Sequence, residues 1–306
     1  MSVTVLNTTG YAAAEALRQP HRFTIMLPIV RPPTMLPHAV RSVLAQTETD
    51  FELCIICDGA PLETVACAES MKRDDPRIRV FAFAKGQRHG EAHRSAVLSG
   101  SRADYVAQIG DDDLWFPDHL TTLARYLKHA DFVSLCQVRM HDGDKVSVLH
   151  YGDLGDSHTR ELMQRKIWNF FGPTEAGYRL TAYRGLESGW TPAPEGVPTD
   201  LFMWRKFLSK KDLRFYSGLA VTSLKFGAYD WKKWSLEKRA EIIKTHSSRL
   251  SDPDAMANLR RRARVQIAKS MTRKQILRFA WQAPIKTLPL AALAVKSKLS
   301  NIFRQE

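Results

Sequence analysis

The sequence has few cysteines and no long apolar run, and each of these shortages excludes a class of protein. Four cysteines among 306 residues are too few for a disulfide scaffold, so the composition favours a reducing, cytoplasmic setting. No stretch reaches the ~18 apolar residues that a membrane-spanning helix needs, and the N-terminus lacks the pattern of a signal peptide. The 44% hydrophobic and 25% charged residues are ordinary for a globular protein with a sizeable core.

Acidic residues are almost absent from the C-terminal end of the chain. Residues 260–306 contain twelve lysines and arginines but a single acid, so eleven of the thirteen net positive charges lie there. No nucleic-acid-binding module accompanies this charge, so we expect no nucleic-acid partner. Cations interleaved with Ile267, Phe279 and Trp281 fit an interfacial anchor on an anionic membrane surface. A pair of helices packed on the main domain, with a solvated basic face, fits the same residues equally well.

Apolar runs alternate with helical patterns over the first half of the chain. Five runs predict buried strands, at residues 23–30, 51–60, 77–83, 104–110 and 131–140. Alternating strands and helices predict a mostly parallel sheet covered on both faces, with ligands outside the carboxyl ends of its strands. The second half is less regular, and the patterns predict helices at 158–171, 177–186, 200–208 and from Ser235, with a strand at 217–226.

Three consecutive carboxylates, Asp111 to Asp113, follow the predicted strand at 104–110. Two unit charges about 5 Å apart repel by roughly 3 kcal/mol at an effective dielectric near 20. A solvated turn at a helix N-terminus tolerates this repulsion, whereas a bound divalent cation converts it into attraction. Asp58 ends another predicted strand, so a parallel sheet would bring all four carboxylates to one edge.

These segments resemble, in their order, the nucleotide-binding half of family 2 glycosyltransferases with the GT-A fold. The resemblance rests on FTIMLPIVRPP, AVRSVLAQTETDFELCIICDGA, DPRIRVFAF and SRADYVAQIGDDDLWFPDHL, the last of which carries the DxD motif. It is strong over 23–135 and looser over 136–250, where GWTPAPEGVPTDLFMW stands at the catalytic segment. The implied fold is α/β and Rossmann-like, with a mostly parallel sheet and flanking helices. The implied organisation is an N-terminal extension at 1–20, a glycosyltransferase domain at 21–258 divided near residue 135, and a basic helical tail at 259–306.

The resemblance also implies a chemistry. It implies inverting, hexosyltransferase-type transfer of a sugar from a nucleotide-sugar to the hydroxyl of a glycan or lipid-linked acceptor, in cell-surface polysaccharide or glycolipid synthesis. Mn²⁺ or Mg²⁺ held by Asp111 and Asp113 would stabilise the leaving diphosphate, and Asp200 would deprotonate the acceptor. The implied donor contacts are Pro28, Asp58, Arg94, Asp111 and Asp112. A peripheral position at the inner face of the membrane would suit a lipid-linked acceptor.

Several positions depart from the family pattern. Cys57 replaces one carboxylate of a strand-end pair, and Thr199 stands where the family has an acid. His246 is the only candidate for a late metal-ligating histidine, and it falls on or just past a predicted helix. Lys225 stands at the corresponding strand position, where it could meet the diphosphate directly.

Two rival functions remain open. A sugar-phosphate nucleotidyltransferase of related fold would show a glycine-rich loop after its first strand, and PIVRPPTM contains no glycine. A catalytically degenerate glycosyltransferase-like binding module would not need the intact Asp111–Asp113 run or Asp200.

Two further patterns have structural explanations. Cys54 and Cys57 lie three positions apart on a predicted strand, so their side chains point to opposite faces and are expected to be buried thiols. An aromatic set fits either an acceptor groove or the core: Trp168, Phe170, Phe171, Tyr178, Tyr183 and Trp190.

Overall fold

A seven-stranded sheet forms the centre of the computed structural model, which describes residues 20–136, 138–141, 145–148, 152–226, 233–272 and 275–276. The strand order is β10-β6-β9-β4-β1-β2-β3. Neighbouring strands are parallel except at β9, which is antiparallel to β4 and β6. The strands are β1 (Phe23–Ile29), β2 (Phe51–Asp58), β3 (Ile78–Phe83), β4 (Tyr105–Gln108), β6 (Phe132–Ser134), β9 (Ala176–Arg179) and β10 (Phe215–Ser217). This confirms the predicted mostly parallel α/β sheet.

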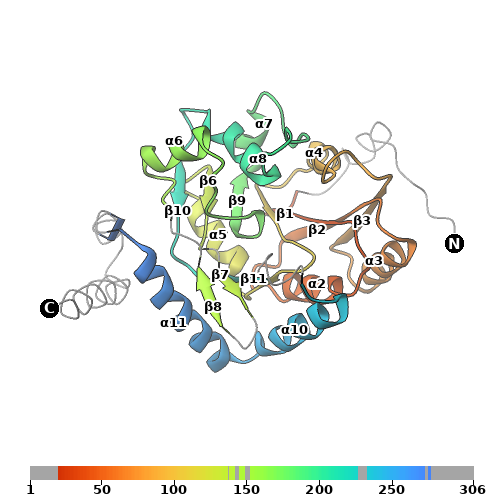
Figure 1. Ribbon diagram of the computed structural model, residues 1–306. Helices are drawn as coiled ribbons and strands as arrows, with labels where there is room; N and C mark the ends of the chain where they lie inside the picture. The colour runs from red at the N-terminus through yellow and green to blue at the C-terminus, as the bar shows by residue number, and fades with distance from the viewer. Residues whose placement is uncertain are drawn as a thin grey trace.

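Helices cover both faces of this sheet (Figure 1). One apolar cluster lies under α2 (Leu36–Leu44), α3 (Leu62–Asp74) and α5 (His119–Leu127). The other lies under α4 (Glu91–Ser99), α6 (Ser157–Arg165), α7 (Leu180–Arg184) and α8 (Thr199–Leu208). Cys57 belongs to the first cluster and Cys54 to the second, as strand alternation predicts. All four cysteines are free thiols.

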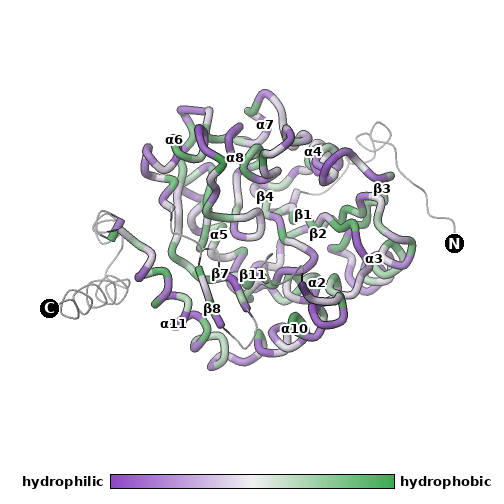
Figure 2. Tube along the Cα trace, in the orientation of Figure 1, coloured by the Kyte–Doolittle hydropathy of each residue, from purple (hydrophilic) through white to green (hydrophobic). Residues whose placement is uncertain are grey.

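A smaller four-stranded sheet packs beside the main one. Its order is β5-β11-β7-β8, formed by β5 (Leu114–Trp115), β11 (Ser223–Phe226), β7 (Val138–Met140) and β8 (Val146–Val148). Two helices, α10 (Leu236–Arg249) and α11 (Pro253–Ser270), lie along its outer side in Figure 1. Hydrophilic residues recur along the outer turns of α11 in Figure 2, while Ala263, Ile267 and Ala268 are buried in the third apolar cluster.

Helix α11 crosses residue 258, the boundary predicted between the catalytic domain and the tail. Residues 1–19 of the predicted N-terminal extension lie outside the described residues, as do 273, 274 and 277–306 of the predicted tail. Within the described ranges, no helix combines the length and apolar character needed to span a bilayer.

Long-range pairing overrides local pattern at several predicted elements. The predicted helix at 177–186 is strand β9 followed by α7, and Gly177 lets β9 lie against Leu123, whose Cδ1 would be 3.0 Å from a Cβ there. The predicted strand at 131–140 divides into β6 and β7, because Leu135 and Cys136 donate backbone hydrogen bonds to Glu175 and Ala220 and leave the main sheet.

The other two differences are changes of length. The predicted strand at 217–226 is formed only at its two ends, by Ser217 of β10 and by β11. The predicted helix at 158–171 ends at Arg165.

The aromatic set belongs to the core. Phe170, Phe171, Tyr178, Tyr183 and Trp190 are at most 7% exposed and pack beneath α8, with Trp168 partly buried at the margin. The indole N–H of Trp190 donates to the Tyr178 hydroxyl at 3.1 Å. Of the two interpretations of this aromatic set, their burial favours the core.

Candidate active site

The predicted site residues gather at the carboxyl edge of the main sheet. Strands β2 and β4 pair in parallel with β1 on its two sides, so their carboxyl ends flank the end of β1. Asp58 ends β2, and Asp111 follows β4 by three residues. Pro28, a predicted donor contact, is partly exposed near the end of β1 and pairs with Ile56 of β2.

The three carboxylates that follow β4 contact two cations. Arg31 lies between Asp111 and Asp112, with its Nε 3.1 Å from Asp111 Oδ2 and its Nη1 3.3 Å from Asp112 Oδ2. The Lys225 ammonium lies 3.0 Å from Asp113 Oδ2, which also accepts a hydrogen bond from the Thr174 hydroxyl. Three carboxyl groups therefore face two cations in this acidic cluster.

With three carboxyl groups and two cations, the acidic cluster disfavours full ionisation of its acids. Burial raises the pKa of Asp111 to about 8; the charge of Asp112 adds to the rise and Arg31 opposes it. Burial also raises the pKa of Asp113, although Lys225 opposes the rise. Asp111 Oδ2 is buried and accepts no hydrogen bond of good geometry from the described residues. Carboxylate oxygens suit Mg²⁺ or Mn²⁺, so the chemistry of these donors fits a divalent ion.

Lys225 remains charged although it is partly buried. Burial alone would lower the pKa of Lys225, but Asp113 and Glu175 outweigh it and hold the pKa above its usual value. Among the described residues, no group of three or more His, Cys, Asp or Glu side chains is arranged to hold a metal. A metal at Asp113 would therefore have to share that carboxylate with Lys225.

Glu175 is a site residue that the sequence reasoning missed. It ends the short 3₁₀ helix η2 (Pro173–Glu175), is fully buried, and accepts hydrogen bonds from the Ser223 hydroxyl and the Gly172 N–H, both at 3.2 Å. Burial raises its pKa to about 7, with Lys225 opposing the rise and Asp113 adding to it. Glu175 is the only charged residue between Ile167 and Tyr178, and that isolation is the signal that could have identified it.

Asp58 sits in a second, self-contained cluster. Its Oδ2 accepts a hydrogen bond from Lys85 Nζ at 2.7 Å, its Oδ1 accepts one from the Gly86 N–H at 2.6 Å, and His93 Nε2 lies 3.3 Å from Oδ1. Gly90, at φ +67°, closes the loop over it, since a Cβ there would lie 2.5 Å from Asp58 Cγ. The predicted nucleotide contact is thus already paired with groups of the chain itself.

Arg94 presents unpaired donors inside the site. It lies on α4, is 6% exposed, and stacks over Trp190 at 5.0 Å from the ring centroid. Its Nη2 donates to the His89 carbonyl at 3.0 Å, whereas its Nε and Nη1 have no hydrogen-bond partner among the described residues. Buried donors without partners are costly, so this arrangement suits an anionic ligand such as a diphosphate.

Asp200 lies in the first turn of α8, where the helix dipole favours a carboxylate. Its Oδ1 accepts from the Leu201 N–H at 2.8 Å and its Oδ2 from Asn169 Nδ2 at 3.0 Å. Burial raises the pKa of Asp200, with these hydrogen bonds and Lys225 opposing the rise. The same carboxylate stabilises the charged form of Arg94. Asp200, Arg94 and Lys225 therefore share one electrostatic environment.

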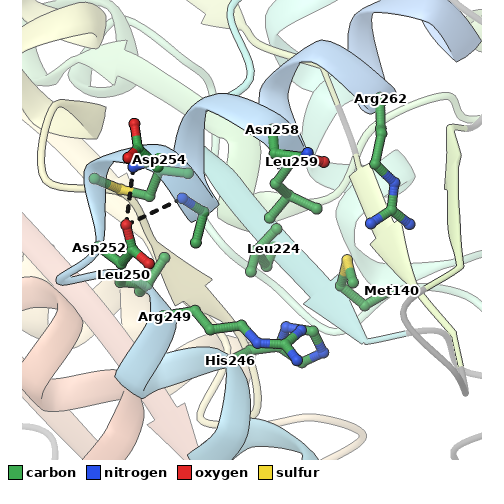
Figure 3. Close-up of a pocket in the computed structure, with 12 residues that line it drawn as sticks. Met140, Leu224, His246, Arg249, Leu250, Asp252, Asp254, Asn258, Leu259 and Arg262 are labelled. Atoms are coloured by element: carbon green, nitrogen blue, oxygen red, sulfur yellow. Dashed lines mark hydrogen bonds between the residues drawn. The ribbon is translucent and has the colours of Figure 1, made fainter.

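His246 lies away from the acidic cluster. It is 4% exposed in the last turn of α10, with its ring 5.6 Å from that of Phe226. It lines a cavity of about 360 Å³ between α10 and α11, together with Leu224 and Arg262 (Figure 3). Residues alternate sides along β11, so Leu224 faces this cavity while Lys225 faces Asp113. Of the two candidates for the late position, Lys225 is the one beside the carboxylates.

Comparison with known proteins gives a consistent result. The model of the Glycosyl transferase family 2 matches residues 24–186. The chain is 29% identical over 142 residues to the succinoglycan biosynthesis protein ExoW of Rhizobium meliloti, covering 45% of this chain and 44% of that protein. It is 33% identical over 95 residues to a chondroitin synthase of Escherichia coli, covering 31% of this chain and 14% of that protein. The chain spans less than half the length of these curated relatives.

Solved structures share the fold over most of the chain. TarS 1–349 of S. aureus superposes with a TM-score of 0.54 at 12% identity, over 88% of this chain and 77% of that chain. The structure of TarS 1–349 in complex with UDP-GlcNAc gives a TM-score of 0.52 at 14% identity, over 89% of this chain and 79% of that chain. The mannosyltransferase PcManGT of Pyrobaculum calidifontis, in complex with GDP-Man and Mn²⁺, gives 0.51 at 14% identity, over 97% and 95%. At these identities the likeness shows the fold alone, and that fold is the predicted one.

Proposed function

The chain belongs to glycosyl transferase family 2 and has the GT-A fold, and from this premise we propose that it is an inverting, hexosyltransferase-type enzyme. It transfers a sugar from a nucleotide-sugar to an acceptor hydroxyl, in polysaccharide or glycolipid synthesis. The observation that carries the proposal is the meeting of two kinds of group at one sheet edge. A charge-binding cluster at Asp111–Asp113 lies there with a half-buried carboxylate, Asp200, which is held by neutral donors.

In the proposed enzyme the donor lies along the carboxyl edge of the sheet. Pro28 and Asp58 contact the nucleoside side, and Asp111 and Asp112 face the ribose. The unpaired nitrogens of Arg94 and the ammonium of Lys225 contact the diphosphate, where their positive charges stabilise the leaving group. Asp111 and Asp113 would hold Mn²⁺ or Mg²⁺, which when bound supplies further Lewis-acid stabilisation of the leaving diphosphate.

Asp200 acts as the general base. Its carboxylate takes the proton of the acceptor hydroxyl while that oxygen forms a bond to the anomeric carbon. The bond from the anomeric carbon to the diphosphate oxygen breaks on the opposite face, so the configuration inverts. A base with a pKa raised by burial is suited to hold this proton near neutral pH. The Thr199 hydroxyl donates to the Glu91 carboxylate at 2.8 Å and anchors this turn of α8 to α4.

The setting proposed for the enzyme is cytoplasmic and peripheral to the membrane. Four free thiols support a reducing compartment. We keep the division into a domain at 21–258 and a basic tail at 259–306, with the tail meeting an anionic membrane surface. On the described part of the tail, Arg261, Arg264 and Lys269 are exposed, which leaves their charges accessible to such a surface.

The experiment that tests the function uses UDP-GlcNAc and GDP-mannose as donors. Thermal shift in the presence of Mn²⁺ selects the nucleotide that binds, and mass analysis then follows release of the sugar to water or to added glycans. We expect one donor to release its nucleoside diphosphate, and release to stop in Asp200→Asn. Formation of a sugar nucleotide from a sugar phosphate and nucleoside triphosphate would instead favour a nucleotidyltransferase. Binding without turnover of either donor would favour a degenerate binding module.

A further inference from the structure

Asn169 contacts the proposed base although it belongs to none of the sequence motifs. It lies in the segment between α6 and η2, thirty-one positions before Asp200 in the chain. Its side-chain Nδ2 donates to Asp200 Oδ2 at 3.0 Å. The reverse orientation of the amide would set its oxygen against the carboxylate, so the chemistry of the pair requires the orientation observed.

The Asp200 carboxylate accepts hydrogen bonds from the backbone and from one side chain. The Leu201 N–H, 2.8 Å from Oδ1, comes from the backbone of α8 and persists whatever the neighbouring side chains are. The Asn169 amide is the side-chain donor on the other oxygen. Among the described residues, Asn169 supplies the side-chain donor to this carboxylate, and the other hydrogen bonds come from the backbone of Asp200 and Leu201.

The other end of the Asn169 amide has no partner. Its Oδ1 is buried and accepts no hydrogen bond from the described residues. A buried acceptor left unpaired is costly in a group that serves packing alone. The unpaired oxygen belongs to an amide whose other end donates to Asp200, so that contact with Asp200 accounts for the amide better than packing does.

The charged groups around Asp200 come from two other elements. Lys225 of β11 and Arg94 of α4 both interact favourably with its charged form. Glu91 of α4 accepts the hydroxyl of the neighbouring Thr199 at 2.8 Å. Asn169 differs from all three because it is neutral and touches the carboxylate directly, so its effect can be separated from theirs by substitution.

We propose that Asn169 is a positioning residue that holds the Asp200 carboxylate turned toward the acceptor hydroxyl. This inference rests on the proposed function, in which Asp200 is the base. It adds a residue that neither the motifs nor the family resemblance supplied. Because the amide donates to the ionised carboxylate, it also favours the deprotonated state that the base requires.

The matched control is Gln164→Leu. Gln164 also carries a side-chain amide, and its Nε2 donates to the Leu208 carbonyl at 2.6 Å, at the opposite end of α8 from Asp200. Both Asn169→Leu and Gln164→Leu remove an amide that ties a neighbouring segment to α8. Only Asn169→Leu removes a donor to Asp200.

The deciding measurement is the titration of the Asp200 carboxyl by ¹³C NMR, in the full-length protein labelled at aspartate Cγ, with Asp200→Asn used to assign the resonance. Loss of a hydrogen bond to an ionised group should raise the midpoint by about one pH unit or more in Asn169→Leu. We expect no change in Gln164→Leu. Equal midpoints in the wild type and Asn169→Leu would overturn the inference.

A second readout separates this inference from the function on which it rests. In hydrolysis of the accepted donor, the acid limb of the pH profile should move upward with the NMR midpoint in Asn169→Leu. If Asp200→Asn keeps wild-type hydrolysis, Asp200 is not the base and the proposed function is wrong at that point. If Asp200→Asn abolishes hydrolysis while Asn169→Leu shifts neither midpoint nor profile, only the role of Asn169 is wrong.

Discussion

The acidic cluster and the Asp200 turn both contain carboxyl groups with raised pKa values, buried at Asp111 and Asp113 and half-buried at Asp200, but their neighbours differ. Asp111 to Asp113 face the full charges of Arg31 and Lys225, whereas the direct partners of Asp200 are an amide and a backbone N–H. Carboxylates paired with cations suit a site that binds an ionic ligand, because the ligand can replace one of the charged partners. Neutral donors leave a carboxylate free to gain and lose a proton. The difference separates a region that binds charge from one that moves a proton.

The largest expected effect comes from neutralising the Asp200 turn. Asp200→Asn keeps the size of the side chain and removes the base, so turnover should fall by about 10²–10⁴. Nucleotide affinity should stay nearly unchanged, because the acidic cluster is intact. Steady-state kinetics and calorimetry of the same protein check both halves of this prediction. Wild-type turnover in this variant would direct attention to Glu195, the nearest other acid along the chain.

The matching change in the acidic cluster should have the opposite signature. Asp113→Asn leaves Lys225 with Glu175 and relieves repulsion from Asp112, so we expect the fold to persist. Nucleoside diphosphate binding in Mn²⁺ should weaken by roughly 10- to 100-fold, the worth of one contact to a charged group. Calorimetry measures the affinity, and circular dichroism controls for folding. An unchanged affinity would remove Asp113 from the donor site.

Glu175 provides a pH test of the charge-binding region. In the folded chain its pKa is raised to about 7 from its usual 4.5, so it holds its proton more tightly folded than unfolded. Its contribution to the free energy of unfolding is therefore full below about pH 4.5 and declines as pH rises to about 7. By the same relation, the free energy of unfolding of the wild type in EDTA should fall by about 2–3 kcal/mol between these pH values because of Glu175. This fall should be absent in Glu175→Gln. Denaturant titrations at several pH values check it, with the exposed Glu63→Gln as the control.

The smallest effect per residue is expected at the outer face of α11, where cations are exposed and not buried beside acids. Truncation at residue 258 would cut α11, remove Ile267 and expose the residues that pack against it in the third cluster. The sharper variant reverses three exposed charges in the full chain, at Arg261, Arg264 and Lys269. Each cation near an anionic leaflet contributes about 1 kcal/mol. Sedimentation with anionic vesicles should therefore decrease in the variant, and in the wild type at high salt. Equal sedimentation of the two proteins would assign these residues a structural role only.

The sequence predicted the parts of the molecule that depend on local pattern. Continuous apolar runs identified β1 and β2, and parallel topology then placed Asp58 and Asp111 at one edge. Strand β9 escaped prediction because it is four residues long, contains Gly177, and is fixed by pairing with β4 and β6 on both sides.

The partners of the site acids could not be predicted in the same way. Lys85 reaches Asp58 across twenty-seven positions, and Asn169 reaches Asp200 across thirty-one. Both lie in loops of the structure, and the helix predicted at 158–171 ends at Arg165 before it reaches Asn169, so only the folded chain shows which acid each one contacts. Lys225 was a candidate because of its strand position, but its contact with Asp113 spans one hundred and twelve positions.

The most direct test of the account is calorimetry of UDP and GDP binding to the wild-type protein, with Mn²⁺ and with EDTA. The central claim is that Asp111 to Asp113 supply more carboxyl groups than Arg31 and Lys225 can pair, so that a divalent cation binds as they ionise and is needed before a diphosphate binds well. The account predicts that one of the two nucleotides binds at least tenfold more tightly in Mn²⁺ than in EDTA, a difference of about 1.4 kcal/mol. Equal affinity in the two conditions would contradict it, and would leave Arg94 and Lys225 as the groups that bind the diphosphate.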